Sequence, residues 1–429
     1  MTDTIFAQAT AVGRAGIAVI RISGPRAFLA VESLAGRLPE DRRAGLRWLR
    51  DSTGGRIDQA LVLCFVGPNS FTGEDIAELH VHGGIAVCRM VADCLAQFEG
   101  LRLAEPGEFS RRALMNGRLD LAELEGLGDL LSAETVAQQR QAMQLMSGTL
   151  SQKTAEWRVR LVRALAIVEA TIDFADDDVP EDAAGFVLPD LSALLAEFGR
   201  EVRGAEVAER LRVGFEVALV GAPNVGKSTL LNRIAGREAA ITSPIAGTTR
   251  DVIEVRMDLG GLPVTILDLA GIRDDGDGLE RLGIARARER AANADLRIFL
   301  VEGEDAPDIE VGIGDLVVRA KADLGGDGAG LVVSGLTGEG VEDVLAAVRR
   351  ELSSRVAGAG LLSHGRQVRA IEMAASALEA ALEEVKRGRH PELAAAELRR
   401  ALRALDFLIG SVDVEAVLDV IFASFCLGK

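Results

Sequence analysis

Residues 221–229 read Gly221-Ala222-Pro223-Asn224-Val225-Gly226-Lys227-Ser228-Thr229, and they decide the fold of the middle of this chain. The apolar run 216–220 precedes them, and a stretch of helical character, 230–234, follows. A strand, a glycine-rich turn and a helix form the context in which G-x-x-x-x-G-K-[ST] binds phosphates. Turn amides and the helix N-terminus point at the phosphates, Lys227 adds a positive charge, and Ser228 offers a hydroxyl to Mg²⁺. The stretch therefore predicts a P-loop.

Two elements downstream extend this prediction to a γ-phosphate sensor. The loop 245–250 contains two threonines that can complete the Mg²⁺ shell, and we favour Thr249 over Thr248. Asp268 ends the predicted strand 264–267, so its carboxylate can reach the Mg²⁺ sphere. The amide of Gly271 can then sense the γ-phosphate. Together these elements predict a switching, nucleotide-hydrolysing domain.

Two more elements indicate guanine. Asp323 follows the predicted strand 316–318 and can accept both donors of the guanine edge, N1–H and the 2-amino group, which adenine lacks. Ser334 and Gly335 follow the strand 331–333 and can offer an amide to guanine O6. Position 320 is alanine, where the motif N-K-x-D has asparagine. One missing neutral hydrogen bond weakens binding by about two- to twelve-fold, so we expect GTP to be preferred over ATP with reduced affinity.

The candidate nucleotide-binding residues form one set, spread over the P-loop, the two switch elements and the base-recognition loops. They are Asn224, Val225, Gly226, Lys227, Ser228, Thr229, Ser243, Pro244, Ile245, Ala246, Gly247, Thr248, Thr249, Asp268, Leu269, Ala270, Gly271, Lys321, Asp323, Ser334, Gly335 and Leu336.

The usual catalytic groups of such domains are missing from the switch region. Ile272 stands where many GTPases have the glutamine that orients water, and no arginine has an evident catalytic place. An arginine finger contributes about 10³- to 10⁵-fold in rate, so another group is needed. The acidic loop 274–280 can supply a carboxylate for the water. Asn224 and the backbone of 243–248 can bind a monovalent cation, such as K⁺, beside the phosphates.

Composition limits the class of protein. The 429 residues predict two to four domains, and no apolar run approaches the roughly 18 residues of a membrane span. No secretory signal is visible and the four cysteines lack metal-type spacing, so we expect a cytoplasmic protein. The net charge of −17 argues against nonspecific nucleic-acid binding as the main activity. We interpret three arginine groups as solvated helix faces: 102, 111, 112 and 118; 158, 160 and 163; and 399, 400 and 403.

The periodicity of the chain predicts α/β and all-α parts. Residues 1–118 form a mixed α/β domain, 119–212 with 355–429 a helical domain, and 213–354 a doubly wound α/β domain inserted between its halves. Strands are expected at 16–22, 60–66, 76–82, 217–220, 263–267, 296–301, 315–319 and 331–333. Helices are expected at 86–98, across 119–173, and at 190–212, 365–388, 391–409 and 412–425. A Gly/Ser-rich joint is expected at 353–360.

The chain resembles the MnmE or TrmE family of tRNA-modification GTPases over almost its full length. The motifs that carry the resemblance lie in every part of the chain. They are 3–5, 13–17, 21–24, the run G-P-N-S-F-T-G-E-D at 67–75, H-G-G at 82–84, P-G-E-F-S at 106–110, N-G-R-L-D-L-A at 116–122, I-D-F at 172–174, A-G-T-T-R-D at 246–251 and F-C-L-G-K at 425–429.

The resemblance implies an N-terminal α+β domain that binds folate and dimerises, a central helical domain and an inserted Ras-like P-loop G domain. It implies a homodimer that joins a FAD-dependent MnmG/GidA-type subunit in a heterotetramer. That complex uses a 5-formyl- or 5,10-methylene-tetrahydrofolate to add an aminomethyl or carboxymethylaminomethyl group to C5 of the wobble uridine, U34, of certain tRNAs. It also implies that K⁺-dependent dimerisation of the G domains activates GTP hydrolysis.

The resemblance assigns roles to matching positions. It implies that K⁺ is bound by Asn224, Ser243, Ile245 and Thr248. It implies that Mg²⁺ is bound by Ser228 and Thr249, and that folate is bound by Arg21, Glu78, Arg118 and Lys429. Glu280 matches the acid that orients the attacking water. Arg118 stands where the family usually has lysine.

Several alternatives stay open. Cys426 is either a nucleophile or a small packed residue near the folate, and we slightly favour the packed residue. His80 and His82 are more consistent with structural than with catalytic histidines. Two other functions compete with tRNA modification: a ribosome-assembly or stress GTPase that acts by binding RNA, and a regulatory switch that recruits partners according to its nucleotide. Specific folate binding separates tRNA modification from both.

Overall fold

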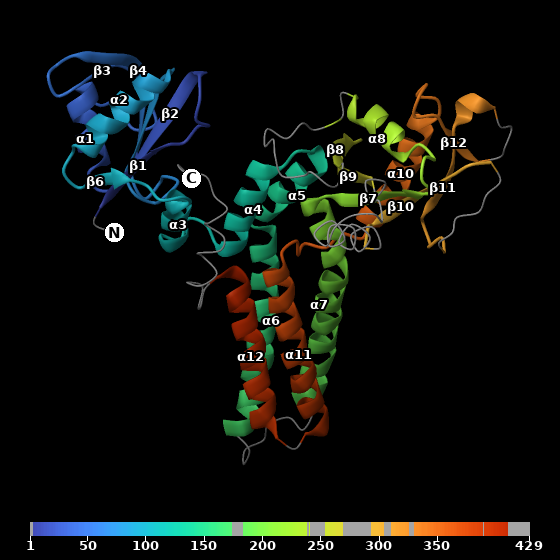
Figure 1. Ribbon diagram of the computed structural model, residues 1–429. Helices are drawn as coiled ribbons and strands as arrows, with labels where there is room; N and C mark the ends of the chain where they lie inside the picture. Colours follow the sequence, from blue (N-terminus) through green and yellow to red (C-terminus); the bar gives the residue numbers. More distant parts are fainter. Residues whose placement is uncertain are drawn as a thin grey trace, which may run out of the picture. The chain divides into compact units, whose positions relative to one another are not determined.

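The structure is a computed structural model, shown in Figure 1. It describes residues 3–173, 183–237, 240, 254–268, 293–303, 310–325, 330–388 and 390–410. The described residues form two compact units, one of 3–128 with 406–410 and one that lies between residues 129 and 405. Each unit contains one six-stranded sheet.

The first unit is built on a mostly antiparallel sheet with strand order β3-β4-β5-β2-β1-β6. Its strands are β1 (Thr4–Gln8), β2 (Ala15–Ser23), β3 (Gly45–Arg50), β4 (Arg56–Phe65), β5 (Ile76–Gly83) and β6 (Leu101–Leu103). The helices α1 (Ala27–Ala35) and α2 (Ile85–Ala96) pack on one face and bury Ala18, Ile20 and Ile22 of β2. Because side chains alternate across a strand, Arg21 points to the opposite face.

Two further helices continue the chain from this sheet. The first is α3 (Glu108–Met115), which buries Phe109 and Ala113. The second is α4 (Leu121–Ser132), in which Leu121, Ala122 and Leu124 are buried. The left-handed Gly107 precedes α3, with φ 71°. Glycine adopts this conformation at little cost, so the chain can turn sharply into the helix.

A helical bundle forms much of the second unit (Figure 1). It comprises α5 (Val136–Met146), α6 (Thr149–Asp173), α7 (Ala183–Val213), α11 (Gly365–Arg387) and α12 (Pro391–Ile409). Trp157 of α6 meets Phe198 of α7 edge to face, with ring centroids 5.1 Å apart, and both are buried. Helix α7 also packs along α11, although about 150 residues separate them in the chain. The segment between these two helices is therefore inserted into the bundle.

The inserted segment contains the second sheet, with strand order β12-β11-β10-β7-β9-β8. Its strands are β7 (Phe215–Gly221), β8 (Glu254–Leu259), β9 (Leu262–Asp268), β10 (Leu296–Val301), β11 (Leu316–Ala320) and β12 (Leu331–Val333). All described pairings are parallel except that of β8 with β9. The helices α8 (Lys227–Ala235) and α10 (Val341–Val356) contribute to its apolar core. Strand β7 lies between β9 and β10, so the strand order reverses beside it, and ligands bind at such switch points.

Most predicted elements are confirmed within a few residues, and β10, β12 and α12 have the expected bounds. The sequence analysis missed β1, β3, β6 and β8. The Gly/Ser-rich joint was predicted to begin at residue 353, but α10 continues to Val356, so this boundary was predicted too early. The predicted helix 412–425 lies outside the described residues. None of the helices in the described ranges is long and apolar enough to cross a membrane.

Candidate functional site

The turn between β7 and α8 has the backbone geometry of a phosphate-binding loop. Asn224 and Gly226 both lie in the left-handed region, with φ 64° and 108°. Asparagine and glycine tolerate this conformation better than other residues do. At Gly221 the backbone passes close to β10, since a Cβ there would lie 2.4 Å from the Leu300 carbonyl oxygen. The sequence therefore places glycine and asparagine at the positions that the turn requires.

Lys227 begins α8 and is almost entirely buried beneath this turn. Its Nζ donates to the carbonyl oxygens of Gly221, at 2.6 Å, and Ala222, at 2.8 Å. Burial lowers the pKa of Lys227 below its ordinary value, and the charge of Asp268 offsets this only in part. A buried ammonium is stabilised by a nearby anion, so the turn is suited to bind phosphate.

Ser228 and Asp268 meet beside this lysine. The Ser228 Oγ donates to Asp268 Oδ2 at 2.6 Å, and Asp268 is 4% exposed. Strand pairing explains the contact, because Asp268 at the end of β9 pairs with Leu219 of β7, just before the turn. A hydroxyl and a carboxylate oxygen are donors that suit Mg²⁺. The residues present therefore fit a magnesium ion held between α8 and β9.

The predicted base-recognition residues also meet. Ser334 Oγ donates to Asp323 Oδ1 at 2.5 Å. Gly335 packs on the start of α8, where a Cβ would lie 2.6 Å from the Leu230 amide nitrogen. Lys321 has φ 61° and its Nζ lies 2.5 Å from Glu302 Oε1. The loops after β11 and β12 are thus joined to each other and to the P-loop helix.

Part of the predicted nucleotide site lies outside the described residues. Those positions are Ser243, Pro244, Ile245, Ala246, Gly247, Thr248, Thr249, Leu269, Ala270, Gly271 and Glu280. Of the positions described, Val225 is buried, whereas Thr229 and Leu336 are exposed. Cys426 and Lys429, predicted for the folate site, also lie outside the described residues.

Arg21 and Glu78, predicted to contact folate, are paired across β2 and β5. The Arg21 Nε donates to Glu78 Oε1 at 2.9 Å, and both side chains are mostly buried. The Arg21 guanidinium also lies over Phe71 and Phe109, 5.4 and 5.8 Å from the ring centroids. The two cation–π contacts and the pair with Glu78 together fix the orientation of the guanidinium.

Arg118 lies near the loop of the G-P-N-S-F-T-G-E-D motif. A Cβ on Gly73 would be 3.2 Å from the Cγ of Arg118, so Gly73 leaves space for this arginine. The amide of Arg118 donates to the Ala113 carbonyl oxygen at 2.8 Å. Arg118 therefore lies against the motif loop, just after the end of α3.

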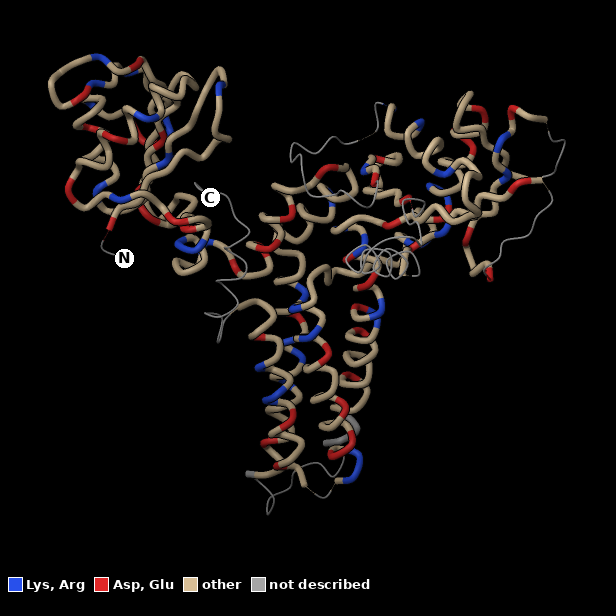
Figure 2. The backbone as a smooth tube through the Cα atoms, in the orientation of Figure 1, with Lys and Arg blue, Asp and Glu red and all other residues tan. Residues whose placement is uncertain are grey.

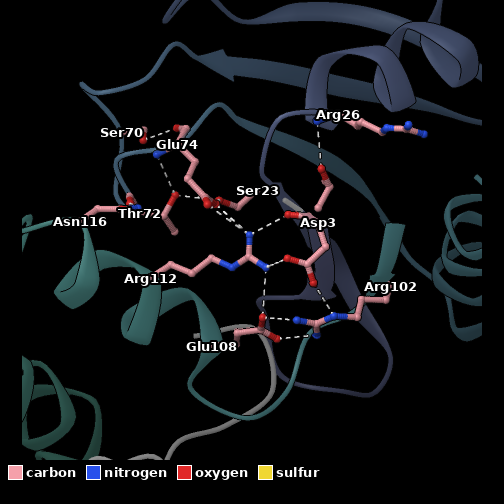
Figure 3. Close-up of polar contacts among 11 residues, drawn as sticks. Asp3, Ser23, Arg26, Ser70, Thr72, Glu74, Arg102, Glu108, Arg112 and Asn116 are labelled. Atoms are coloured by element: carbon pink, nitrogen blue, oxygen red, sulfur yellow. Dashed lines mark hydrogen bonds and ion pairs between the residues drawn. The ribbon is translucent and has the colours of Figure 1, made fainter. Parts of the chain in front are cut away.

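Arg112 does not lie on a solvated helix face, which corrects the interpretation from sequence. It is 0% exposed at the centre of the network in Figure 3. Its Nη1 donates to Glu74 Oε2 and to the Asp3 carbonyl oxygen, both at 3.0 Å. Its Nη2 donates to Asp3 Oδ1 at 3.0 Å and to Glu108 Oε1 at 3.1 Å. This arginine joins the start of β1 and α3 to the motif loop.

The same network orders the loop that follows the cis Gly67–Pro68 bond. Ser23 Oγ contacts Thr72 Oγ1 at 2.7 Å and donates to Glu74 Oε2 at 2.8 Å. Asn116 Nδ2 donates to the Thr72 carbonyl oxygen at 2.6 Å. These motifs were identified from the sequence, but the hydrogen-bond network that joins them was not predicted. Their composition gave a hint of it, because the motifs that contain Ser23, Thr72 and Asn116 each combine charged and small polar residues.

The two strand histidines each have a carboxylate partner. His80 Nε2 lies 3.3 Å from Glu78 Oε2. His82 Nδ1 lies 2.8 Å from Asp58 Oδ1, and its amide donates to Asp58 Oδ2 at 2.8 Å. Acidic and basic residues are interspersed along the described part of the bundle helices (Figure 2).

Comparisons with known proteins agree across the chain. The family description "GTP-binding protein TrmE N-terminus" matches residues 4–118, and "MnmE helical domain" matches residues 121–426. The chain is 57% identical over 431 residues to the tRNA modification GTPase MnmE of Cereibacter sphaeroides. It is 53% identical over 434 residues to that of Roseobacter denitrificans. Each match covers 100% of this chain and 100% of the relative.

Solved structures with some likeness include a variant of Aquifex aeolicus Era bound to GDP.AlF4-, with 23% identity and a TM-score of 0.24. That match covers 38% of this chain and 66% of the other. The G domain of the T. maritima FeoB iron transporter has 22% identity and a TM-score of 0.24, with 33% of this chain and 98% of that one covered. TM-scores this low support no inference about function.

Proposed function

Because this chain belongs to the tRNA modification GTPase MnmE family, it is a GTP-hydrolysing enzyme that acts in tRNA modification, and we propose a more specific activity. Together with a FAD-dependent MnmG/GidA-type subunit, it adds an aminomethyl or carboxymethylaminomethyl group to C5 of the wobble uridine, U34. A 5-formyl- or 5,10-methylene-tetrahydrofolate supplies the carbon. The observation that carries the nucleotide half of this proposal is the convergence of Lys227, Ser228 and Asp268 at one switch point.

At the nucleotide site, each described residue has a role that its contacts support. The P-loop amides and Lys227 bind the phosphates, while Ser228 and Asp268 hold Mg²⁺. When bound, Mg²⁺ neutralises charge that develops on the phosphates. Asp323, oriented by Ser334, accepts the two donors of the guanine edge. Guanine selectivity therefore depends on a carboxylate that a neighbouring hydroxyl holds in place.

Replacing the carboxylate of Asp323 by an amide tests this assignment. Asp323→Asn is expected to weaken GDP binding and to strengthen xanthosine diphosphate binding, because an amide donates to the 2-oxo group of xanthine. Losing a hydrogen bond to a charged group costs about 1.5–3 kcal/mol, which predicts a roughly 10- to 150-fold weaker Kd for GDP. Calorimetric titration of both nucleotides measures the exchange. If the variant keeps its preference for GDP, Asp323 does not read the base.

Hydrolysis is assigned to positions that match the family. We propose that Thr249 completes the Mg²⁺ shell, the Gly271 amide contacts the γ-phosphate, and Glu280 orients the water. Asn224, Ser243, Ile245 and Thr248 would hold K⁺ beside the phosphates, where it would supply the positive charge that an arginine supplies in other GTPases. Of these positions Asn224 lies among the described residues, exposed in the P-loop turn. Its exposure is compatible with a contact completed by another copy of the chain.

The folate half of the proposal rests on the Arg21–Glu78 pair. A guanidinium and a carboxylate fixed side by side can together accept and donate the hydrogen bonds of a pterin edge. The pair lies on the sheet face opposite α1 and α2. Arg118 is proposed as a third contact, and Lys429 as a fourth. Cys426 is proposed as a packed residue rather than a nucleophile.

Folate binding provides a direct test. Arg21→Ala is expected to weaken 5-formyltetrahydrofolate binding by about 10-fold or more, because it removes charge-assisted hydrogen bonds. Arg56→Ala is a matched control, since Arg56 stacks on Trp48 at 4.5 Å and should leave folate binding unchanged. Equilibrium titration of both variants measures the difference. If the wild-type chain binds no folate, an RNA-binding or regulatory GTPase becomes the better assignment.

The remaining parts of the proposal concern organisation. We propose a homodimer that forms a heterotetramer with the FAD-dependent subunit and acts on tRNA in the cytoplasm. We also propose the division into a folate-binding part, 1–118, a helical part, 119–212 with 355–429, and an inserted G domain, 213–354. The packing of α7 on α11 supports the insertion. The mixed charge of the bundle favours tRNA contact that depends mainly on the partner subunit (Figure 2).

A further inference from the structure

Position 320 is alanine where the N-K-x-D motif has asparagine, so it lacks an amide that could brace the base-recognition site. Ala320 ends β11, pairs with Val333 of β12 and packs against the apolar core of the sheet. Its methyl group can neither donate nor accept a hydrogen bond. Any polar link between α8 and the base-recognition loops must therefore come from other residues.

Helix α8 itself provides such a link. Gly335 lies on its first turn, where a Cβ would come within 2.6 Å of the Leu230 amide nitrogen. One turn further along, Arg233 Nη2 donates to the Leu336 carbonyl oxygen. The same guanidinium lies beside Gly338, where a Cβ would be 3.3 Å from Arg233 Nε. Two successive turns of α8 thus hold the loop 334–338.

Hydrogen bonds within the loop 334–338 connect Leu336 to Asp323. The Ser334 amide donates to the Glu339 carbonyl oxygen, and the Gly338 amide to that of Ser334, both at 2.9 Å. The Thr337 amide donates to Ser334 Oγ at 3.1 Å, and that oxygen in turn donates to Asp323. A loop closed by several internal hydrogen bonds moves as one piece.

We propose that Arg233 is a positioning residue for guanine recognition, which holds the loop 334–338 on α8 and replaces the bracing that Ala320 cannot provide. Arg233 does not itself touch the nucleotide. It acts through Leu336 and Ser334 on the orientation of Asp323. The inference rests on the proposed role of Asp323 as the guanine acceptor.

A second arginine, just beyond the end of α8, makes the inference testable. Arg237 follows the C-cap Gly236 and donates to Glu342 of α10, outside the loop 334–338. In the full-length chain, Arg233→Met is expected to raise the Kd for GDP by about two- to twelve-fold. The kcat at saturating GTP should stay unchanged, because Lys227 and Ser228 are untouched. Arg237→Met should bind GDP as the wild type does.

Rescue separates a positioning role from general destabilisation. Ala320→Asn added to Arg233→Met should return the Kd for GDP close to the wild-type value, because an amide at 320 restores the missing link. Arg233→Lys, which keeps a donor at this exposed position, should have an intermediate Kd. An unchanged Kd in Arg233→Met, equal weakening by Arg237→Met, or no rescue by Ala320→Asn would each overturn the inference. If Asp323→Asn changes base selectivity while these results fail, the guanine assignment stands and only the role of Arg233 is rejected.

Discussion

Replacing K⁺ by Na⁺ at equal ionic strength is expected to lower the GTPase rate at high protein concentration by up to about 10³-fold, the lower end of the contribution of an arginine finger. The physical reason is the missing charge near the γ-phosphate. The switch region has no catalytic arginine in an evident place, and Ile272 cannot orient water. Among the proposed K⁺ ligands, Asn224 is the one that lies within the described residues, and it is exposed in the P-loop turn.

The measurement is the GTPase rate per subunit in K⁺ and in Na⁺, over a wide range of protein concentration. Stimulation should occur with K⁺ and rise with concentration, because two G domains must meet to complete the site. Asn224→Ala should abolish most of the stimulation by K⁺. Equal rates in the two salts at all concentrations would contradict the cation mechanism and require another activator.

Arg112→Met is expected to lower the stability of the first unit by about 3–5 kcal/mol, the cost of removing one partner from a buried ionic network. Asp3, Glu74 and Glu108 all accept hydrogen bonds from this guanidinium (Figure 3). The side chains of Glu74 and Glu108 are only 14% and 8% exposed. Without Arg112, no guanidinium would remain among the described contacts of Glu74. Glu108 would still accept a hydrogen bond from Arg102.

Hydrogen exchange of β1 and β2 amides in the full-length chain measures this loss as a lower free energy of opening. Arg43→Met is the matched control, because Arg43 and Glu40 form a surface pair with 76% of each side chain exposed. Surface pairs contribute little, so its exchange should match the wild type. Similar exchange in both variants would show that the network does not stabilise the unit.

Glu108 adds a pH signature to the same network. Burial alone would raise its pKa, but hydrogen bonds from Arg102 and Arg112 outweigh burial and hold the pKa below its ordinary value of 4.5. A depressed pKa in the folded state contributes stability above the unfolded pKa. That contribution is lost as the pH falls through the folded pKa. The network therefore weakens in acid as Glu108 becomes protonated.

The local pattern of the nucleotide site could be predicted from short stretches of sequence. The P-loop, Asp268 and Asp323 could be predicted because each depends on a short run with its own strand, turn or helix signal, and such signals are local. Strands β1, β3, β6 and β8 were missed, because short strands are recognised mainly by their partners in the sheet.

Which charged residues are buried, and which side chains meet, could not be predicted without the three-dimensional structure. Arg112 and Arg43 are the same residue type in polar surroundings, yet one is enclosed by three carboxylates and the other lies at the surface. Arg233 and Leu336 meet because α8 and the loop after β12 converge, although about 100 residues separate them. Burial and long-range hydrogen bonds depend on how distant segments pack, and no short stretch of sequence contains that information.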